Sequence, residues 1–321
     1  MFLTVTPNPC IERTVVIPDF AAGARHRVAP QDLFADAGGK GINAARVAGK
    51  FGVETLALTW IGEHQRAWFE SELLRDNVPH ELVETASDTR VCVNILDGCG
   101  GKTEVVEAGN PLGISDGTRL LERFAQLLPR ASLVAICGSY PSAAPENETV
   151  FASHATLLCR MAHAANVRVI LDSKGAAFSV ALNDALSRNT KIWCIKPNIS
   201  EAEEFFQRPI LSRDAEIRAL DELRQFAKNV LLSCGELGCY LATHNQIFFF
   251  HAPQIEALSP VGSGDSLVGA FAAKILLGAS EIEALRWGVS AGAANAMQVR
   301  AGFCTREEIE ALVGQVQVEE L

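Results

Sequence analysis

The chain has 321 residues, a length typical of two domains or of one large α/β domain with an appendage. Hydrophobic residues make up 48% and charged residues 21%, which excludes a disordered chain and a small disulfide scaffold. The 28 Lys and Arg against 38 Asp and Glu give a net charge of -10, which disfavours nucleic acid or an anionic membrane as a partner but leaves room for a local basic pocket.

Short apolar runs alternate with amphipathic stretches along most of the chain. The apolar runs predict buried strands at 2–6, 55–61, 133–137, 167–172, 191–196 and 229–234. Helical periodicity predicts helices at 146–165, 175–187 and 199–227, the last broken near Pro209. Two or three β runs follow between 238 and 258, and then helices at 265–277, 281–299 and 306–316. This alternation predicts an α/β fold with a mainly parallel sheet covered by helices on both faces.

Two stretches, 11–35 and 89–106, lack a helical period and predict strands of a small, separate sheet. The second stretch contains a hairpin whose turn we place at 97–102. We interpret these stretches as a β-sheet lid inserted into the main domain. The main domain then consists of residues 1–10, 36–88 and 107–321.

Cysteine usage and the first residues predict a cytoplasmic protein. The nine cysteines are scattered and include no CxxC pair, so the usual zinc spacing is absent and reduced core thiols are expected. The opening sequence MFLTVTPNPC has no basic segment and is interrupted by Pro7 and Pro9, so it predicts no secretory signal. No apolar run approaches the roughly 20 residues of a membrane span, and we expect no membrane partner.

The most informative motif is the segment Val261–Leu267, which opens a long helix of small residues. Glycines before a helix let backbone N–H groups converge on one point, where the helix dipole adds positive potential, so the segment predicts an anion hole. Asp265 in the same turn would repel a bound phosphate unless it removes a proton from an attacking hydroxyl. The structural alternative is that Asp265 simply caps the helix.

Three further motifs stand at the ends of predicted strands or before helices. In the segment 36–43, glycines let a ligand approach the backbone, Lys40 offers a positive charge and Asn43 a hydrogen-bonding amide. In the segment 196–201, Asn198 and Glu201 share one face of a helical turn and are suited to Mg²⁺ held through water, or to an N-cap box. The segment 233–238 is a glycine turn after a strand, which can shelter a nucleotide or be a plain turn.

Taken in order, the motifs TxNPxxxxT, GGKGIN, TR, GSYP, KPNxxE, SxGxxG and GxGD resemble the PfkB branch of the ribokinase-like carbohydrate kinases. The chain is most similar to the 1-phosphofructokinase and tagatose-6-phosphate kinase group, and the likeness runs along nearly its whole length. The resemblance implies a ribokinase-like three-layer sandwich, a β-sheet lid that also forms a dimer contact, and the use of ATP and Mg²⁺.

The resemblance also implies roles for residues on the nucleotide side. Asp265 matches the catalytic base, and the anion hole matches Gly262, Ser263 and Gly264. Asn198 and Glu201 match a metal and phosphate motif. The nucleotide loop matches Ser233, Gly235 and Gly238, and Asn295 falls near the adenine pocket.

On the substrate side, Gly39, Lys40 and Asn43 match a sugar-phosphate loop, Arg90 matches a lid arginine that meets the substrate phosphate, and Ser139 lies near the sugar. Two segments depart from the family pattern. Glu12 stands where the NPxxDxT motif has Asp, and Cys92 and Asn94 replace the polar and basic residues of TRxNxK. A phosphate contact is therefore in question, and Arg13, Arg25 and Arg27 are candidates to replace it.

These observations predict an ATP-dependent kinase that phosphorylates a hydroxyl of a ketohexose phosphate, with Asp265 as general base. Two alternatives remain open at this point. One is a kinase of the same fold that acts on an unphosphorylated sugar or nucleoside. The other is a non-catalytic homologue that binds nucleotide or sugar.

Overall fold

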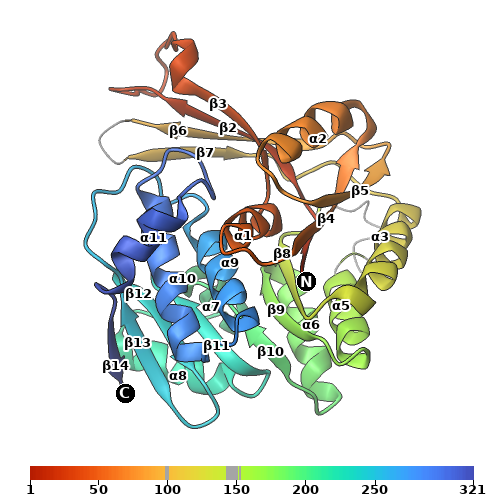
Figure 1. Cartoon of the computed structure of the whole chain (residues 1–321), viewed down its shortest axis with the longest axis vertical. Helices are drawn as coiled ribbons and strands as arrows, with labels where there is room; N and C mark the ends of the chain where they lie inside the picture. The colour runs from red at the N-terminus through yellow and green to blue at the C-terminus, as the bar shows by residue number, and fades with distance from the viewer. Residues whose placement is uncertain (98–100, 142–150, 152) are drawn as a thin grey trace.

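The computed structural model of the chain describes residues 1–97, 101–141, 151 and 153–321, and two β-sheets organise it (Figure 1). The larger sheet has ten strands and lies between two layers of helices. The smaller sheet has four strands and packs at one edge of this sandwich. The α/β fold with a mainly parallel sheet is as the sequence predicts.

The large sheet has the strand order β14-β13-β12-β11-β10-β9-β8-β1-β4-β5. Its parallel part consists of β1 (Phe2–Thr6), β4 (Thr55–Gly62), β5 (His80–Thr85), β8 (Leu133–Gly138), β9 (Arg168–Ser173), β10 (Ile192–Ile195) and β11 (Ala227–Ser233). Its antiparallel end consists of β12 (Gly238–Ala242), β13 (Ile247–His251) and β14 (Gln317–Glu320). The parallel strands are almost continuous apolar runs because both of their faces are covered.

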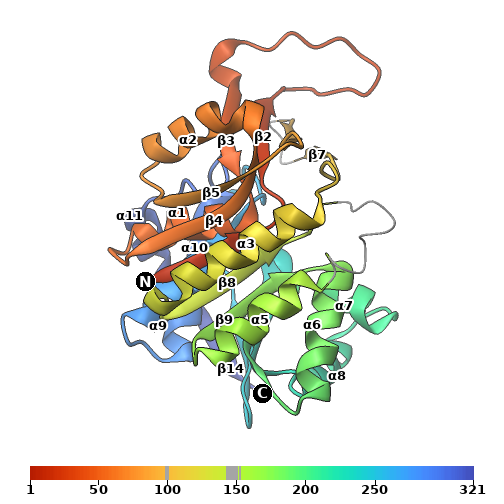
Figure 2. The same ribbon diagram turned by 90° about the vertical axis from the view of Figure 1, so that its right-hand side faces the viewer.

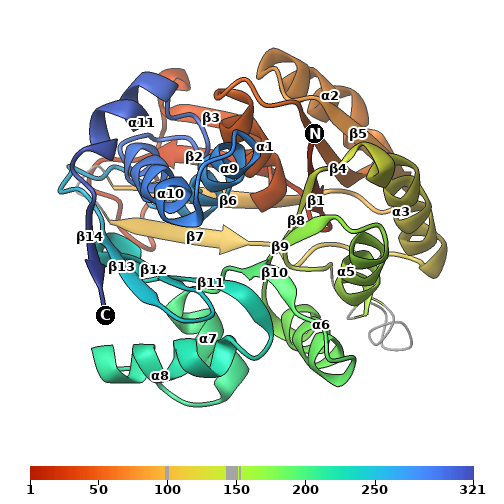
Figure 3. The ribbon, with the colours of Figure 1, turned by 60° about the horizontal axis from the view of Figure 1, so that its bottom comes forward.

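Helices cover both faces of this sheet (Figure 3). One face is covered by α3 (Ile114–Leu127), α5 (His154–Ala164), α6 (Gly175–Ser187), α7 (Ile199–Phe206) and α8 (Arg213–Leu223). The other face is covered by α1 (Lys40–Gly49), α2 (Arg66–Arg75), α9 (Ser263–Leu276), α10 (Glu281–Ala296) and α11 (Arg306–Val313). None of the described helices has the length and apolarity needed to cross a bilayer.

Small residues bring α1 and α9 into close contact, which matters because each helix begins at a predicted motif. A Cβ on Gly269 of α9 would lie 2.4 Å from the carbonyl oxygen of Ala44 in α1. The absence of a side chain at this position therefore lets the two backbones approach. The close contact fixes the start of α9 relative to the start of α1.

The four-stranded sheet has the order β3-β2-β6-β7, formed by β2 (Cys10–Val16), β3 (Leu33–Gly38), β6 (Arg90–Leu96) and β7 (Lys102–Val106). Strands β2 and β6 pair in parallel, and the other two pairs are antiparallel. Figure 2 shows the long connection between β2 and β3 reaching away from the rest of the chain. The four strands come from the two stretches in which we expected a separate sheet.

The element boundaries differ from the predicted ones in a few places. Helix α9 begins at Ser263, two residues before the predicted start, so Ser263 and Gly264 belong to its first turn. The predicted break near Pro209 is present, since α7 ends at Phe206 and α8 begins at Arg213. Parts of the predicted hairpin turn (98–100) and of the predicted helix at 146–165 (146–150 and 152) lie outside the described residues.

Candidate active site

The predicted motifs meet at the carboxyl ends of the parallel strands, where open α/β sheets usually bind their ligands. Ser139 follows β8, and Asp172 lies at the end of β9. Lys196 follows β10, and Ser233 ends β11. The first turns of α1 and α9 face the same region, since Asn43 and Asp265 are in contact.

Asp265 lies in the first turn of α9 and is 8% exposed. The helix is preceded by Gly262, whose φ of 81° lies in the left-handed region, and a Cβ there would lie 2.6 Å from Cβ of Ala301. Only glycine fits both the conformation and the space. Burial raises the pKa of Asp265 above its ordinary value, against the opposing effect of Lys40. A carboxylate with a raised pKa is better suited to accept a proton near neutral pH.

Asn43 orients the Asp265 carboxylate. Its Nδ2 donates a hydrogen bond to Oδ2 of Asp265 at 2.9 Å, and its Oδ1 accepts one from Nη1 of Arg46 at 2.7 Å. The second bond fixes which end of the amide faces Asp265. Arg46 is itself buried and donates to the carbonyl of Ala37 at 2.9 Å. The resemblance matched Asn43 to a sugar-phosphate loop, and in the structure its amide holds the predicted base.

A largely buried cluster of two lysines and two carboxylates lies beside Asp265, and we call it the lysine cluster. Its members are Lys40, Lys196, Asp172 and Glu201. Oδ1 of Asp172 accepts hydrogen bonds from Lys40 at 3.1 Å and is 3.2 Å from Nζ of Lys196. Lys40 also donates to Oε1 of Glu201 at 3.3 Å. Burial opposes the charge on Asp172, but Lys196 and Lys40 outweigh it and hold the pKa of Asp172 below its ordinary value. The other oxygen, Oδ2 of Asp172, is buried and has no hydrogen-bond partner among the described residues.

Lys40 was expected to meet a sugar phosphate, which stays a prediction. In this structure its ammonium has two carboxylate partners, Asp172 at the end of β9 and Glu201 in the first turn of α7. Burial opposes the positive charge of Lys40, and Asp172 and Glu201 outweigh that effect and raise its pKa. A Cβ on Gly264 would lie 3.4 Å from Nζ of Lys196, so that ammonium lies against the first turn of α9. Lysine charges and helix N–H groups thus face one space, an arrangement that favours a phosphoryl group.

Asn198 and Glu201 form an N-cap box at the start of α7. Oδ1 of Asn198 accepts from the backbone N–H of Glu201 at 2.8 Å, and Oε2 of Glu201 accepts from the N–H of Asn198 at 2.9 Å. The structural alternative that we considered is therefore present. It leaves Oε1 of Glu201 facing Lys40, so one carboxylate both caps the helix and contributes to the lysine cluster.

The buried side chain of Asn295 holds the backbone just before α9 in place. It is fully buried, and its Nδ2 donates to the carbonyl of Val261 at 2.8 Å. Its Oδ1 accepts from the N–H of Gly302 at 2.6 Å and from Oγ of Ser266 at 3.1 Å. A side chain without exposure cannot contact a nucleotide directly, so Asn295 is not a nucleotide ligand in this structure, and the expectation that it falls near the adenine pocket stays a prediction. Its bonds fix the backbone from which α9 begins.

The predicted nucleotide loop has a clear conformational requirement at one glycine. A single turn, Gly235–Leu237, connects β11 to β12. Gly238 has a φ of 133°, and a Cβ there would lie 1.9 Å from the carbonyl oxygen of Phe250 on β13. The glycine is thus required by strand packing. Gly235 has a φ of 60° and no atom within 4 Å of its Cβ position, so its surroundings are open.

The two departures from the family pattern contact each other. Nδ2 of Asn94 on β6 donates to Oε1 of Glu12 on β2 at 3.0 Å, and both side chains are buried. Burial, followed by the nearby charge of Asp265, raises the pKa of Glu12 to about 7. Glu12 therefore faces the predicted base from the four-stranded sheet. This contact between Glu12 and Asn94 was not apparent from the sequence.

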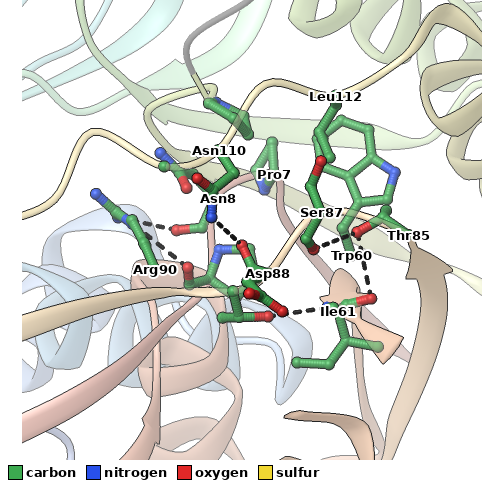
Figure 4. A pocket seen from close by; sticks show the side chains of 15 residues that line it. Pro7, Asn8, Trp60, Ile61, Thr85, Ser87, Asp88, Arg90, Asn110 and Leu112 are labelled. Atoms are coloured by element: carbon green, nitrogen blue, oxygen red, sulfur yellow. Dashed lines mark hydrogen bonds between the residues drawn. The ribbon is translucent and has the colours of Figure 1, made fainter. Parts of the chain in front are cut away.

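Arg90 is held by backbone carbonyl groups (Figure 4). Its guanidinium donates to the carbonyls of Asn8 at 2.9 Å, Glu107 at 3.0 Å and Pro9 at 3.3 Å. These bonds tie the start of β2 to the segment after β7. In this structure Arg90, which we expected to bind a phosphate, therefore connects the segment before β2 to the segment after β7.

A cavity of about 480 Å³ lies between the end of β7 and the ends of β8 and β9. Arg90, Ser139, Lys174 and Glu204 line it, and the Glu204 carboxylate lies near Gly175, the neighbour of Lys174. Lys174 precedes α6 and makes no ion pair within the described part of the chain. Ser139 accepts a hydrogen bond from Nδ2 of Asn8 at 3.3 Å. The cavity has the polar lining and the size of a small-ligand site.

Sequence reasoning did not single out Asp172, gave no role to Lys196 and passed over Lys174. A signal existed for Asp172, because a lone carboxylate closes the apolar run VRVILD at the functional end of a parallel strand. Within the described residues there is no group of three or more His, Cys, Asp or Glu that could hold a metal. Mg²⁺ often binds through one or two carboxylates together with substrate phosphates, so such a group is not required for it.

Comparisons with known proteins find the same fold in solved carbohydrate kinases. The chain resembles phosphofructokinase-2 from Escherichia coli, solved in complex with potassium, at 26% identity over 98% of each chain and a TM-score of 0.85. It has the fold of a possible 1-phosphofructokinase from Thermotoga maritima, at 21% identity over 100% of this chain and 99% of that one and a TM-score of 0.88. Ribokinase from Arabidopsis thaliana shares the fold at 19% identity over 97% and 98% and a TM-score of 0.72.

The model of one protein family, described as pfkB family carbohydrate kinase, matches residues 10–315. This match includes both the lysine cluster and the start of α9. The chain therefore belongs to the pfkB family and is a carbohydrate kinase that transfers a phosphoryl group to a sugar hydroxyl.

Proposed function

We propose that this kinase transfers the γ-phosphoryl group of ATP to a hydroxyl of a ketohexose phosphate, as a 1-phosphofructokinase or a tagatose-6-phosphate kinase does. The observation that carries the proposal is the position of Asp265, buried in the first turn of α9 and facing the lysine cluster. A similar protein supports the acceptor class, since phosphofructokinase-2 from Escherichia coli was solved in complex with fructose-6-phosphate.

In the proposed mechanism, Asp265 accepts the proton of the acceptor hydroxyl as its oxygen attacks phosphorus. Asn43 holds the carboxylate in one orientation, and the raised pKa of Asp265 makes it a more effective base. The N–H groups of Gly262 and Gly264 stabilise the charge on the transferring group, whereas the N–H of Ser263 already donates to the carbonyl of Pro260 at 3.2 Å. Lys40 and Lys196 add positive charge at the same point. Positioning and electrostatic stabilisation supply most of the rate in such transfers.

The oxygen donors beside the lysines fit Mg²⁺. Oδ2 of Asp172 is a buried oxygen without a hydrogen-bond partner among the described residues, and Glu201 is near enough to share Lys40 with Asp172. Mg²⁺ favours carboxylate oxygens and usually keeps several waters. Asp172 and Glu201 would hold the ion through water, with Asn198 orienting Glu201. When bound, the ion neutralises charge on the β- and γ-phosphates.

The catalytic assignment is tested with Asp265→Asn. We expect turnover to fall by about 10²- to 10⁴-fold, because an amide cannot accept the proton, while the affinity for ATP stays nearly unchanged. The matched control is Asp214→Asn, which changes an exposed carboxylate in the first turn of α8. A loss of less than tenfold in Asp265→Asn would remove this residue from the role of base.

The acceptor is tested by measuring ADP release with a panel of phosphorylated and free ketoses. For a ketohexose phosphate, we propose that the 480 Å³ cavity holds the phosphate, with Lys174 as its free cation. Lys174→Gln should then raise KM for the phosphorylated acceptor much more than KM for ATP. Equal effects on both would contradict this placement.

A second candidate acceptor is an unphosphorylated sugar or nucleoside, and one observation favours it. The Arg90 guanidinium already donates to three carbonyls, and Asn94 offers no charge where the family motif has a basic residue. Turnover on free sugars with none on their phosphates would establish this alternative. ATP-dependent thermal stabilisation without turnover on any acceptor would instead indicate a non-catalytic homologue.

We also propose that the chain dimerises through the outer face of the four-stranded sheet. Val15 pairs with Leu33 and Val93 with Val105 across this face, on the side opposite the buried Glu12. Leu33 is 50% and Val105 56% exposed, an apolar surface of the kind that proteins cover with a partner. Light scattering should find a dimer, and Val105→Glu should dissociate it. A monomeric wild-type chain would refute the proposal.

A further inference from the structure

A second cavity lies at the amino ends of β9 and β10, at the opposite end of the parallel strands from the site. It has a volume of about 690 Å³ and is bounded by the first residues of β9 and β10 and by the last turns of α5 and α6. In Figure 1 these ends come together at the lower right. Asp172 lies four residues beyond Arg168 along β9, which is about 13 Å at the usual rise per residue. The cavity is therefore distinct from the lysine cluster.

The charge of this cavity is opposite to that of the whole chain. Its lining contains five cationic side chains and one carboxylate, Asp184, among the described residues. The cationic side chains are Arg160, Arg168, Arg188, Lys191 and Lys228. Their formal sum is a net charge of about +4, in a chain whose net charge is -10. We call this cavity the basic groove.

Two of the five cations have a local explanation. Arg160 donates to Asp184 at 2.9 Å, and Arg188 approaches the same carboxylate at 3.7 Å. Both also lie near helix C-termini, where positive side chains are favourable. Asp184 carries one negative charge against the two positive charges of Arg160 and Arg188, so these three side chains together keep a net positive charge. The helix ends do not account for the three cations at the starts of strands.

The three strand cations surround Trp193. Arg168 begins β9 and its guanidinium lies 5.0 Å from the centre of the Trp193 ring, and Lys228 on β11 lies beside Trp193 on the adjacent strand. Neither Arg168 nor Lys228 makes an ion pair with any residue that the structure describes. Among the described residues, Lys191 contacts a backbone carbonyl, that of Arg224, at 2.6 Å and makes no ion pair. Arg168 and Lys228 are therefore exposed charges that are free to bind an anion, and Lys191 adds a third positive charge beside them.

From this arrangement we infer that the basic groove binds a small phosphate ester that carries two or more phosphoryl groups. Guanidinium and ammonium groups from several elements match several phosphate oxygens at once. The volume lies within the range of small-molecule sites. The strong negative charge of the rest of the chain disfavours an extended polyanion such as nucleic acid. A compact ligand can instead use the positive potential of the groove alone.

The experiment is a calorimetric titration with inorganic pyrophosphate, repeated with ATP and with fructose 1,6-bisphosphate to distinguish a nucleotide from a sugar bisphosphate. Arg168→Gln/Lys228→Gln removes the two unpaired cations of the groove. Arg218→Gln is the matched control, since Arg218 is an exposed arginine of α8 without an ion pair among the described residues. Lys40→Gln identifies any binding at the active site. Melting temperatures confirm that each variant is folded.

We expect the double variant to weaken one class of pyrophosphate binding by about tenfold or more, because two charged contacts are lost. The same class should persist in Lys40→Gln, be unchanged in Arg218→Gln and weaken as salt is added. The tighter of the two organic ligands then identifies the source of the phosphate groups. Identical titrations of the double variant and the wild type, an equal loss in Arg218→Gln, or no binding of any of the three probes would overturn the inference. Because none of these readouts is turnover, they stand apart from the proposed kinase acceptor.

Discussion

Replacing Asp172 by Asn tests the buried charge cluster most directly. The side chains of Asp172 and Lys196 are 1% and 3% exposed, and Oδ1 of Asp172 lies 3.1 Å from Lys40 and 3.2 Å from Lys196. The amide of Asn keeps the shape and removes the charge. Lys196 then loses its one carboxylate partner within the described residues, while Lys40 keeps Glu201. A buried ammonium without a partner is costly.

The free energy of unfolding should therefore fall by about 3–5 kcal/mol, the usual cost of removing one member of a buried ion pair. The matched control is Asp184→Asn, which also removes a carboxylate with two basic partners. Those partners, Arg160 and Arg188, have side chains that are 45% and 51% exposed, so water replaces the lost contact. A loss of only about 0–1 kcal/mol is expected there. Urea denaturation of both variants measures the difference.

The pH dependence supplies a second readout. Lys196 and Lys40 hold the pKa of Asp172 in the folded state below its value in the unfolded chain, which is about 3.9. The folded state therefore binds fewer protons, and the stabilisation by Asp172 is complete above about pH 5 and is lost as the pH falls through the folded pKa. The gap between wild type and Asp172→Asn should be constant from about pH 5 to 8 and shrink below about pH 4. A loss equal to that of Asp184→Asn, or a gap that does not change in acid, would refute the reasoning.

Three other substitutions follow from the site geometry. The pKa of Glu12 is raised to about 7, so between about pH 4.5 and 7 the folded state holds a proton that the unfolded chain has lost. Wild type therefore loses stability as the pH rises, and the free energy of unfolding of Glu12→Gln should gain about 3 kcal/mol relative to wild type between pH 4 and pH 8. Denaturation experiments that show no such gain would contradict the burial of Glu12 as a charged group. Asn43→Ala should lower kcat roughly 10- to 100-fold with KM for ATP little changed, because the base loses its orientation; steady-state kinetics showing unchanged kcat would count against that role. Gly262→Ala should destabilise the chain by about 2 kcal/mol or more and reduce turnover, because the new Cβ meets Ala301. The control is Gly278→Ala, with a φ of 90° and no atom within 4 Å of its Cβ position, which should show only the backbone cost of about 1 kcal/mol. Equal losses of stability in the two variants would mean that the contact with Ala301 does not matter.

Local patterns predicted most of the parallel strands and the two helix starts that matter, but not α2, β5 or α3. The buried parallel strands are apolar runs, and Gly262 precedes α9 for a conformational reason that its neighbours in the sequence suggest. The exposed strand β14 (Gln317–Glu320) was missed, because its sequence QVEE has no apolar run and it is a strand only through pairing with β13. Edge strands of this kind depend on their partner more than on their own residues.

The side-chain pairings of the site could not be predicted in the same way. Asn43 and Asp265 are 222 positions apart, and Lys40 is 132 positions from Asp172. Each motif predicted a polar group near a ligand, but which polar group faces which depends on how α1 and α9 pack against each other on one face of the sheet. That is why Lys40 was assigned to a sugar phosphate and Asp172 was overlooked. Arg90 shows the same limit, since backbone carbonyls are acceptors that no motif reveals.

The charges of the site also constrain the form in which its nucleotide arrives. Lys40 and Lys196 face Asp172, Glu201 and Asp265, so two cations meet three carboxylates and the formal charge is -1 when all are ionised. A nucleotide triphosphate brings several more negative charges to this point, and like charges in a poorly solvated site repel strongly. The N–H groups at the start of α9 contribute only about half a positive charge. Such a site favours a nucleotide whose phosphates are already neutralised by a divalent cation over the free nucleotide.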